Sequence, residues 1–151
     1  MITAATCLAM ALYYEARGED PYGMLAVAEV IINRVQHPDF PGTVCEVIKE
    51  DRGPESYDCQ FSFYCDGLPE RPTDLVAWST ARDIAHQALD GEVLGHGATY
   101  YHATSVHPFW ADIFTPVGQV GDHIFYTDET RCVLPFCSPR SVARPEGLIN
   151  E

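Results

Sequence analysis

Two helical segments separated by only a few residues, at 3–16 and 21–36, constrain the fold of this chain most strongly. Apolar residues lie almost all round the first segment, which predicts a deeply buried helix. Gly18 ends this segment, and Asp20 followed by Pro21 is typical of the cap and first turn of another helix. The second segment has its apolar residues on one stripe, namely Leu25, Ala28, Ile31, Ile32 and Val35. The chain is therefore expected to begin with one buried helix and one amphipathic helix.

Shorter patterns predict the remaining elements. Thr43 and Glu46 match a capping box that opens a short helix ending near residue 50. Residues 73–90 predict a third long helix, and its expected inner face consists of Leu75, Trp78, Ala81, Ala85 and Leu89. Residues 99–103 and 123–127 are typical of short strands. The loop between these strands is expected to hold Pro108, Pro116, Gly118 and Gly121. The predicted fold class is α+β, mostly helical, with a small antiparallel β-element.

The length of 151 residues allows one domain with a substantial core and little room for a second. We expect the folded domain to occupy residues 1–137 and a loose tail, which carries Pro and Arg, to occupy 138–151. Residues 51–72 are rich in Gly and Pro. A loop of this length in a compact domain is usually functional.

The net charge of −13 argues against two classes of partner. Nucleic acids and anionic membranes attract basic surfaces, so non-specific binding to either is not expected. No stretch approaches about 20 consecutive apolar residues, so no membrane span is expected. The first residues, MITAATCLAMALYY, lack the basic residues and the cleavage site of a signal peptide, and a buried helix is the better interpretation.

The six cysteines suggest an oxidising compartment, with reduced thiols as the alternative. No CxxC pair is present, which argues against a zinc ribbon. Cys59 and Cys65 flank QFSFY, and Cys132 and Cys137 flank VLPF, so each close pair is a candidate disulfide. Cys7 lies in the apolar helix and is expected to be a buried thiol.

Glu15 is the strongest candidate for a catalytic acid. It falls near the C-terminal end of a largely buried helix, where both the helix dipole and the apolar surroundings disfavour a negative charge. Both effects favour the protonated form that a general acid needs near neutral pH. The alternatives are an ion pair with Arg17 or Arg34, or simple exposure to solvent. For Asp20 a capping role is expected, and the role of Glu19 stays open.

The histidines raise the alternative of a metal site. His102 and His107 are five residues apart, and His123 lies on the expected partner strand, so two or three of them could surround zinc. The chain has no HExxH motif, however, and also lacks GxSxG, Walker A and GxGxxG sequences. We therefore expect neither a metal nor another cofactor.

Four stretches taken together resemble one protein family, the SleB/CwlJ-type cell-wall hydrolases. These stretches are LAMALYYEARGED, GMLAVAEVIINRVQHPDFPGTVCEVI, CQFSFYCDG and GATYYHATSVHPFW, and together they cover roughly residues 5 to 126. The resemblance implies a mostly helical catalytic domain related to lytic transglycosylases and to resuscitation-promoting factors. It implies that peptidoglycan is the substrate and that the β-1,4 bond from N-acetylmuramic acid to N-acetylglucosamine is cleaved.

The resemblance also assigns roles to particular residues. The catalytic acid is the first glutamate of the EARGE segment, Glu15, which serves as acid and then as base and leaves a 1,6-anhydro product. If Glu19 instead positions a water molecule, the product is a plain reducing sugar. The expected glycan contacts are Glu19, Gln60, Phe61, Ser62, Tyr101, His102 and His123. The family often has Asn where this chain has His102.

We expect a monomer that acts on peptidoglycan in the cell envelope, exported or delivered by a phage. The chain shows neither a signal peptide nor a wall-binding module, which suits a phage lysin or a catalytic domain cut from a longer protein. Two alternatives belong to other classes. One is a zinc-dependent amidase or peptidase that uses the histidines, and the other is a glycan-binding protein without activity.

Overall fold

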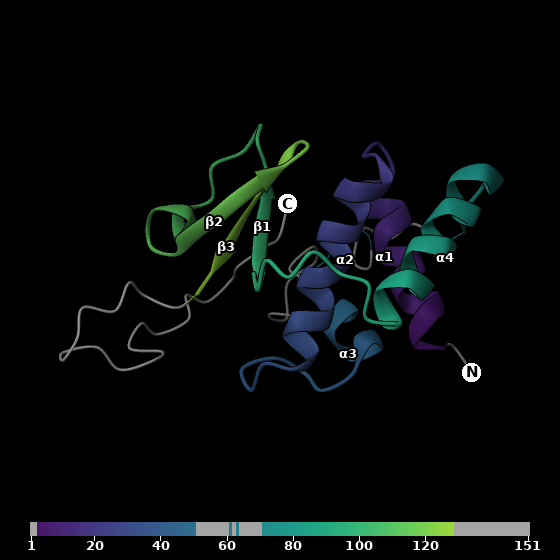
Figure 1. Cartoon of the computed structure of the whole chain (residues 1–151), viewed down its shortest axis with the longest axis horizontal. Coiled ribbons are helices and arrows are strands. Elements are labelled where there is room, and N and C mark those ends of the chain that lie inside the picture. Colours follow the sequence, from purple (N-terminus) through teal and green to yellow (C-terminus); the bar gives the residue numbers. More distant parts are fainter. Residues whose placement is uncertain (1–2, 51–60, 62, 64–70, 129–151) are drawn as a thin grey trace.

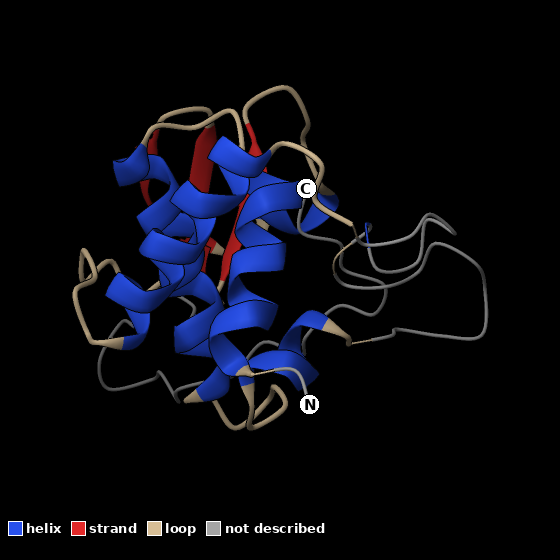
Figure 2. Ribbon diagram, turned by 90° about the vertical axis from the view of Figure 1, so that its right-hand side faces the viewer, coloured by secondary structure: helices blue, strands red, loops and turns tan. Residues whose placement is uncertain are grey.

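The computed structural model describes residues 3–50, 61, 63 and 71–128, and these form a helical layer beside a small sheet (Figure 1). The elements, in chain order, are α1 (Ala4–Ala16), α2 (Pro21–Val35), α3 (Val44–Ile48), α4 (Leu75–Leu89), β1 (Tyr100–Ala103), η2 (Phe109–Asp112), β2 (Thr115–Val120) and β3 (His123–Thr127). Helix α2 lies between the sheet and the pair formed by α1 and α4 (Figure 1). Figure 2 shows the helices in front of the three strands. The predicted mostly helical α+β fold is confirmed.

Side-chain caps begin each α-helix of the described residues, and two of them, at Asp20 and Thr43, were predicted from the sequence. Asp20 accepts a hydrogen bond from the backbone N–H of Gly23 at 2.8 Å, directly before Pro21. Thr43 accepts from the N–H of Glu46 at 3.2 Å. The other two caps are Thr3 for α1 and Asp74 for α4. Each cap satisfies a backbone donor that the first turn of a helix leaves without a partner.

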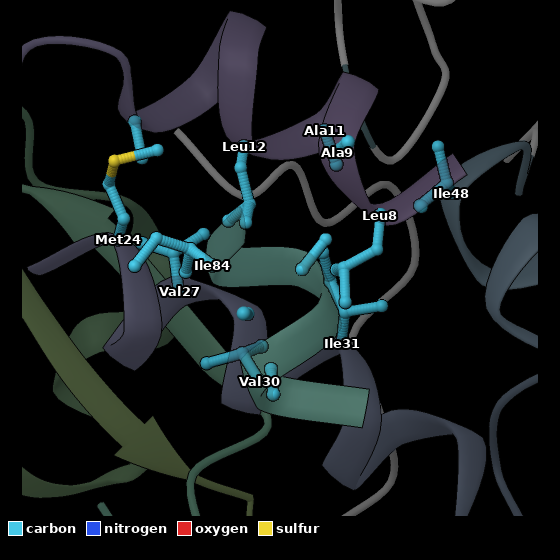
Figure 3. Close-up of a cluster of buried hydrophobic side chains, with 14 of the residues drawn as sticks. Leu8, Ala9, Ala11, Leu12, Met24, Val27, Val30, Ile31, Ile48 and Ile84 are labelled. Atoms are coloured by element: carbon cyan, nitrogen blue, oxygen red, sulfur yellow. The ribbon is translucent and has the colours of Figure 1, made fainter. Parts of the chain in front are cut away.

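The core forms where α1, α2, α3 and α4 meet, as Figure 3 shows for side chains such as Leu8, Leu12, Val27 and Ile84. Helix α1 is buried on most of its surface, as predicted. Its buried residues are Cys7, Leu8, Ala9, Ala11, Leu12, Tyr13 and Ala16. Several of these are alanines, which let neighbouring helices approach closely. No described helix has the length and apolar character needed to cross a membrane.

The predicted inner face of α4 is only partly correct. The buried residues of α4 are Ala81, Ile84, Ala85 and Ala88. Leu75 is 73% exposed and Leu89 is 39% exposed. Because a helix has 3.6 residues per turn, Leu75 lies on the far side from this stripe and Leu89 lies at its edge. The predicted stripe keeps the helical period but is rotated from the buried one, so its two leucines fall outside the core.

The sheet is antiparallel, with strand order β1-β3-β2. Strand β2 occupies a segment that was predicted to be loop because it contains Pro116 and Gly118. It is an edge strand, and the register shifts between Pro116 and Gly118. Proline and bulges are tolerated at sheet edges, where one side of the backbone needs no partner. Pro116 and Gly118 therefore disturb the register of the strand, but they do not prevent it from forming.

A disulfide joins Cys7 in α1 to Cys45 in α3, with a Cα–Cα distance of 5.4 Å. This corrects the prediction that Cys7 is a buried thiol, because its partner lies 38 residues away in sequence and only the packing of α3 on α1 brings it near. The other four cysteines, including both close pairs predicted as disulfides, lie outside the described residues. So do the proposed tail at 138–151 and most of the loop at 51–72.

We expect loss of this disulfide to destabilise the domain substantially. A bridge that closes a loop of 38 residues contributes about 4 kcal/mol in the chain-entropy treatment. The double variant Cys7→Ala/Cys45→Ala should therefore unfold at a clearly lower urea concentration than the wild type. Cys45→Ala alone is the matched control, since it breaks the bridge but keeps the buried sulfur of Cys7. An unchanged urea midpoint in both variants would contradict a stabilising role.

Candidate active site

Glu15 lies in the last turn of α1, and its side chain is neither fully buried nor fully exposed. That turn contains no basic residue. The preceding residue, Tyr14, stacks on Phe63 with ring centroids 4.9 Å apart. Arg17, the C-cap of α1, donates to the hydroxyl of Tyr13. Glu15 is therefore held at the negative end of the α1 dipole, next in sequence to a tyrosine that stacks on Phe63.

Glu19 follows α1 closely and contacts the turn between β2 and β3. Its backbone N–H donates to the carbonyl of Ala16 at 3.0 Å. Its carboxylate oxygen Oε1 accepts from the N–H of Asp122 at 3.0 Å and lies 3.0 Å from Nδ1 of His123. The side chain is only 11% exposed. The structure thus joins the connection after α1 to a turn more than one hundred residues later in the chain.

Tyr101 and His123 lie on the helix-facing side of the sheet. Tyr101 pairs with Phe125 across β1 and β3, and His123 pairs with Ala103, so these residues share one face. The ring of Tyr101 meets the ring of His123 edge-on at 5.2 Å. Both side chains are buried. Of the predicted glycan contacts, the structure therefore gathers Glu19, Tyr101 and His123. Tyr101 has no exposed surface, however, so its predicted glycan contact is corrected to a packing role.

His102 faces the opposite side of the sheet. Its Nε2 lies 2.9 Å from the hydroxyl of Tyr126, and its Nδ1 lies 2.7 Å from the carbonyl of Ala103. It is 2% exposed and its ring stacks on Tyr126. Successive residues of a strand point to opposite faces, so Tyr101 and His102 cannot both face Glu19. We assign His102 to the packing of a second aromatic cluster, composed of Phe40, Tyr100, Trp110, Phe114 and Tyr126.

The QFS segment is represented by Phe61 alone, because Gln60 and Ser62 lie outside the described residues. Phe61 has no exposed surface and belongs to the main core. A side chain without exposed surface cannot contact a glycan directly, so its predicted groove role is corrected to a packing role. Phe63, two residues further along, stacks on Tyr14 of α1.

The three histidines of the zinc alternative do not surround a common point in the described part of the chain. His102 and His123 are on opposite faces of the sheet, and His107 is exposed and contacts Asp112 at 3.1 Å. A zinc site needs three or four donors directed at one ion. This arrangement therefore gives the amidase or peptidase alternative no support.

Another group that sequence reasoning missed consists of His37, Asp39 and Asp128, whose donor atoms lie within 4.8 Å of one another. The backbone N–H of Asp39 donates to Nδ1 of His37 at 3.1 Å. A neutral ring that accepts at Nδ1 carries its proton on Nε2, the atom that lies 3.6 Å from Asp128. The contact between His37 and Asp128 therefore joins the segment after α2 to the end of β3.

Burial lowers the pKa of His123, against the opposing effect of the Glu19 carboxylate. As the pH falls below about 6.5, the unfolded chain takes up a proton at this residue that the folded chain resists. We therefore expect the free energy of unfolding to decrease over this range and His123→Gln to reduce that decrease, as measured by urea unfolding at several pH values. His107→Gln, at an exposed histidine, is the control for the loss of an imidazole outside the core. Equal pH dependence in wild type and His123→Gln would contradict the expectation.

Comparison with known proteins gives consistent results. Residues 18–126 match the family model described as Cell Wall Hydrolase, a range that begins three residues after Glu15. The chain is 36% identical over 119 residues to a spore cortex-lytic enzyme of Halalkalibacterium halodurans, covering 78% of this chain and 33% of the relative. It is 33% identical over 119 residues to a spore cortex-lytic enzyme of Bacillus cereus, covering 78% of this chain and 42% of the relative. The chain thus spans less than half the length of these relatives.

A solved structure is also similar over most of the chain. It is the catalytic domain of the germination-specific lytic transglycosylase SleB from Bacillus anthracis, with 32% sequence identity and a TM-score of 0.66. The match covers 82% of this chain and 93% of that domain. The sequence resemblance and the fold therefore agree, and the chain belongs to the cell wall hydrolase family.

Proposed function

We propose that this chain is a peptidoglycan lytic transglycosylase that cleaves the β-1,4 bond between N-acetylmuramic acid and N-acetylglucosamine, with Glu15 as its acid and base. Family membership supports a glycan-cleaving enzyme of the cell wall. The similar solved structure is named as the catalytic domain of a lytic transglycosylase, and this chain covers 93% of it. The position of Glu15 at the end of α1 supports its assignment as the acid.

In this mechanism, the protonated carboxyl of Glu15 donates its proton to the glycosidic oxygen. The bond from that oxygen to C1 of the muramic sugar breaks, and C1 develops oxocarbenium character. The Glu15 carboxylate then removes the proton of the muramic 6-hydroxyl, whose oxygen forms a bond to C1. The product is a 1,6-anhydro sugar, no water is consumed, and Glu15 is again protonated.

The observation that carries this proposal is that Glu19, the other glutamate of the EARGE segment, already has partners for its carboxylate. Its Oε1 already accepts from Asp122 and contacts His123, and the side chain is 11% exposed. Glycosidases that use water or a carboxylate nucleophile usually need a second available carboxylate. An occupied Glu19 therefore favours the route in which one residue is acid and base and the substrate's own hydroxyl is the nucleophile.

Three further properties are part of the proposal. The substrate is the glycan strand of peptidoglycan in the cell envelope, outside the reducing cytoplasm. The Cys7–Cys45 disulfide supports this location, because disulfides form and persist in oxidising compartments. The active form is a monomer, and residues 1–137 form its catalytic domain.

The decisive experiment compares wild type and Glu15→Gln on purified peptidoglycan and identifies the released muropeptides by mass spectrometry. We expect anhydro-muramyl products from wild type and a rate at least about 10²-fold lower for Glu15→Gln, because the amide cannot transfer the proton. The exposed residue Glu92 offers the control Glu92→Gln, which should retain wild-type activity.

Two other product patterns would contradict the proposal in different ways. Reducing muramyl ends, about 18 Da heavier because water has been added, would establish a hydrolytic muramidase instead. Free peptides with intact glycan would overturn glycan cleavage altogether. Binding to peptidoglycan without any product would identify a glycan-binding protein that lacks activity.

A further inference from the structure

We propose that Glu19 is a positioning residue whose carboxylate locks the β2–β3 turn against the segment that follows the catalytic helix. We call the four participating residues, Glu19, Gly121, Asp122 and His123, the hairpin clamp. Its catalytic consequence rests on the function proposed above, but the clamp itself does not. It replaces the expectation that Glu19 contacts the glycan with an indirect role.

The first half of the hairpin clamp is a pair of polar contacts from one oxygen atom. Oε1 of Glu19 accepts from the N–H of Asp122 at 3.0 Å and lies 3.0 Å from Nδ1 of His123. Hydrogen bonds to an ionised carboxylate are roughly twice as strong as those between neutral groups. The two partners are consecutive residues, so one carboxylate fixes both the end of the turn and the first residue of β3.

The second half of the hairpin clamp is steric. A methyl group on Gly121 would overlap with Oε2 of Glu19, and one on Gly23 would lie 3.0 Å from the same atom. Gly121 also has φ +57°, a conformation that residues with a side chain rarely adopt. The space for the carboxylate therefore exists because glycines lie on two sides of it, one from α2 and one from the turn.

The hairpin clamp also determines how His123 is presented. The Glu19 carboxylate lies 3.0 Å from Nδ1 of the ring. The ring is further held by edge-on contacts with Tyr101 at 5.2 Å and Phe125 at 6.4 Å. Glu19 thus helps to hold in place the one histidine on the helix-facing side of the described sheet.

The connection to catalysis runs through the short segment between Glu15 and Glu19. Helix α1 ends at Ala16, and the N–H of Glu19 bonds to the carbonyl of that residue. Any displacement of the turn therefore acts on the segment directly after the acid. A misplacement of about 1 Å can lower a rate about 10²-fold even when the altered residue does not touch the substrate.

A comparison of Glu19→Gln with Glu19→Ala separates positioning from chemistry. The Gln carbonyl can still accept from Asp122, so Glu19→Gln should keep kcat on soluble peptidoglycan strands within about tenfold of wild type. Glu19→Ala removes the contact and should lower kcat about 10²-fold with little change in KM. Equal, near-complete loss in both folded variants would overturn the proposal, because it would mean that Glu19 transfers a proton or holds a water.

Glycine variants test the steric half. Gly121→Ala should lower kcat as Glu19→Ala does. Gly91 is the control, since it also has positive φ but has nothing near its missing side chain, so Gly91→Ala reports backbone strain without displacing a carboxylate. Beyond Glu19→Ala, the double variant Glu19→Ala/Gly121→Ala should lose no more than Gly91→Ala loses from wild type, because the overlap is gone and only backbone strain is left. Fully additive losses would contradict the hairpin clamp.

A measurement that needs no substrate tests the hairpin clamp independently of the proposed function. NMR titration of the His123 ring should give a lower pKa in Glu19→Gln than in wild type, because the Glu19 charge raises the pKa of His123 against the effect of burial. An unchanged pKa would overturn the hairpin clamp. Absence of glycan cleavage by wild type, together with a lowered pKa in Glu19→Gln, would instead overturn the function and leave the clamp established.

Discussion

The burial of helix α1 is the constraint on which the rest of the structure depends. Because α1 is covered on most of its surface, α2, α3 and α4 must all pack around it, and their order in space follows. The same packing fixes α1, and so places Glu15 in its last turn, at the negative end of the helix dipole. The disulfide from Cys7 to Cys45 reinforces this arrangement at the other end of α1.

The small sheet matters to the site mainly because successive side chains of a strand point to opposite faces. Its helix-facing side presents Tyr101, His123 and Phe125, while its other side joins Tyr100, His102 and Tyr126 in a separate aromatic cluster. Alternate residues of these aromatic strands therefore lie on opposite faces of the sheet. The residues on one face point toward Glu19 and the end of α1, and those on the other face pack together within the β-element.

Several sequence predictions were confirmed because they rest on local physics. The helices, their caps at Asp20 and Thr43, and two of the three strands were predicted from period, capping chemistry and β-propensity. The failures share a different cause. Strand β2, the exposed Leu75, and the bonded Cys7 depend on which neighbour, if any, lies beside a segment after folding. Such neighbours come from distant parts of the chain, so no local pattern contains them.

The sequence by itself determined the α-helices, two of the strands and the family resemblance, and it proposes Glu15 as the acid, since each depends on residues within one short stretch or on their order. Only the tertiary structure revealed the partners of Glu19. Its contacts with Asp122 and His123 span a sequence separation of more than one hundred residues. The physical reason is that the role of a carboxylate depends on the groups that it contacts. Packing of the sheet on α2 brings these groups within hydrogen-bonding distance of Glu19.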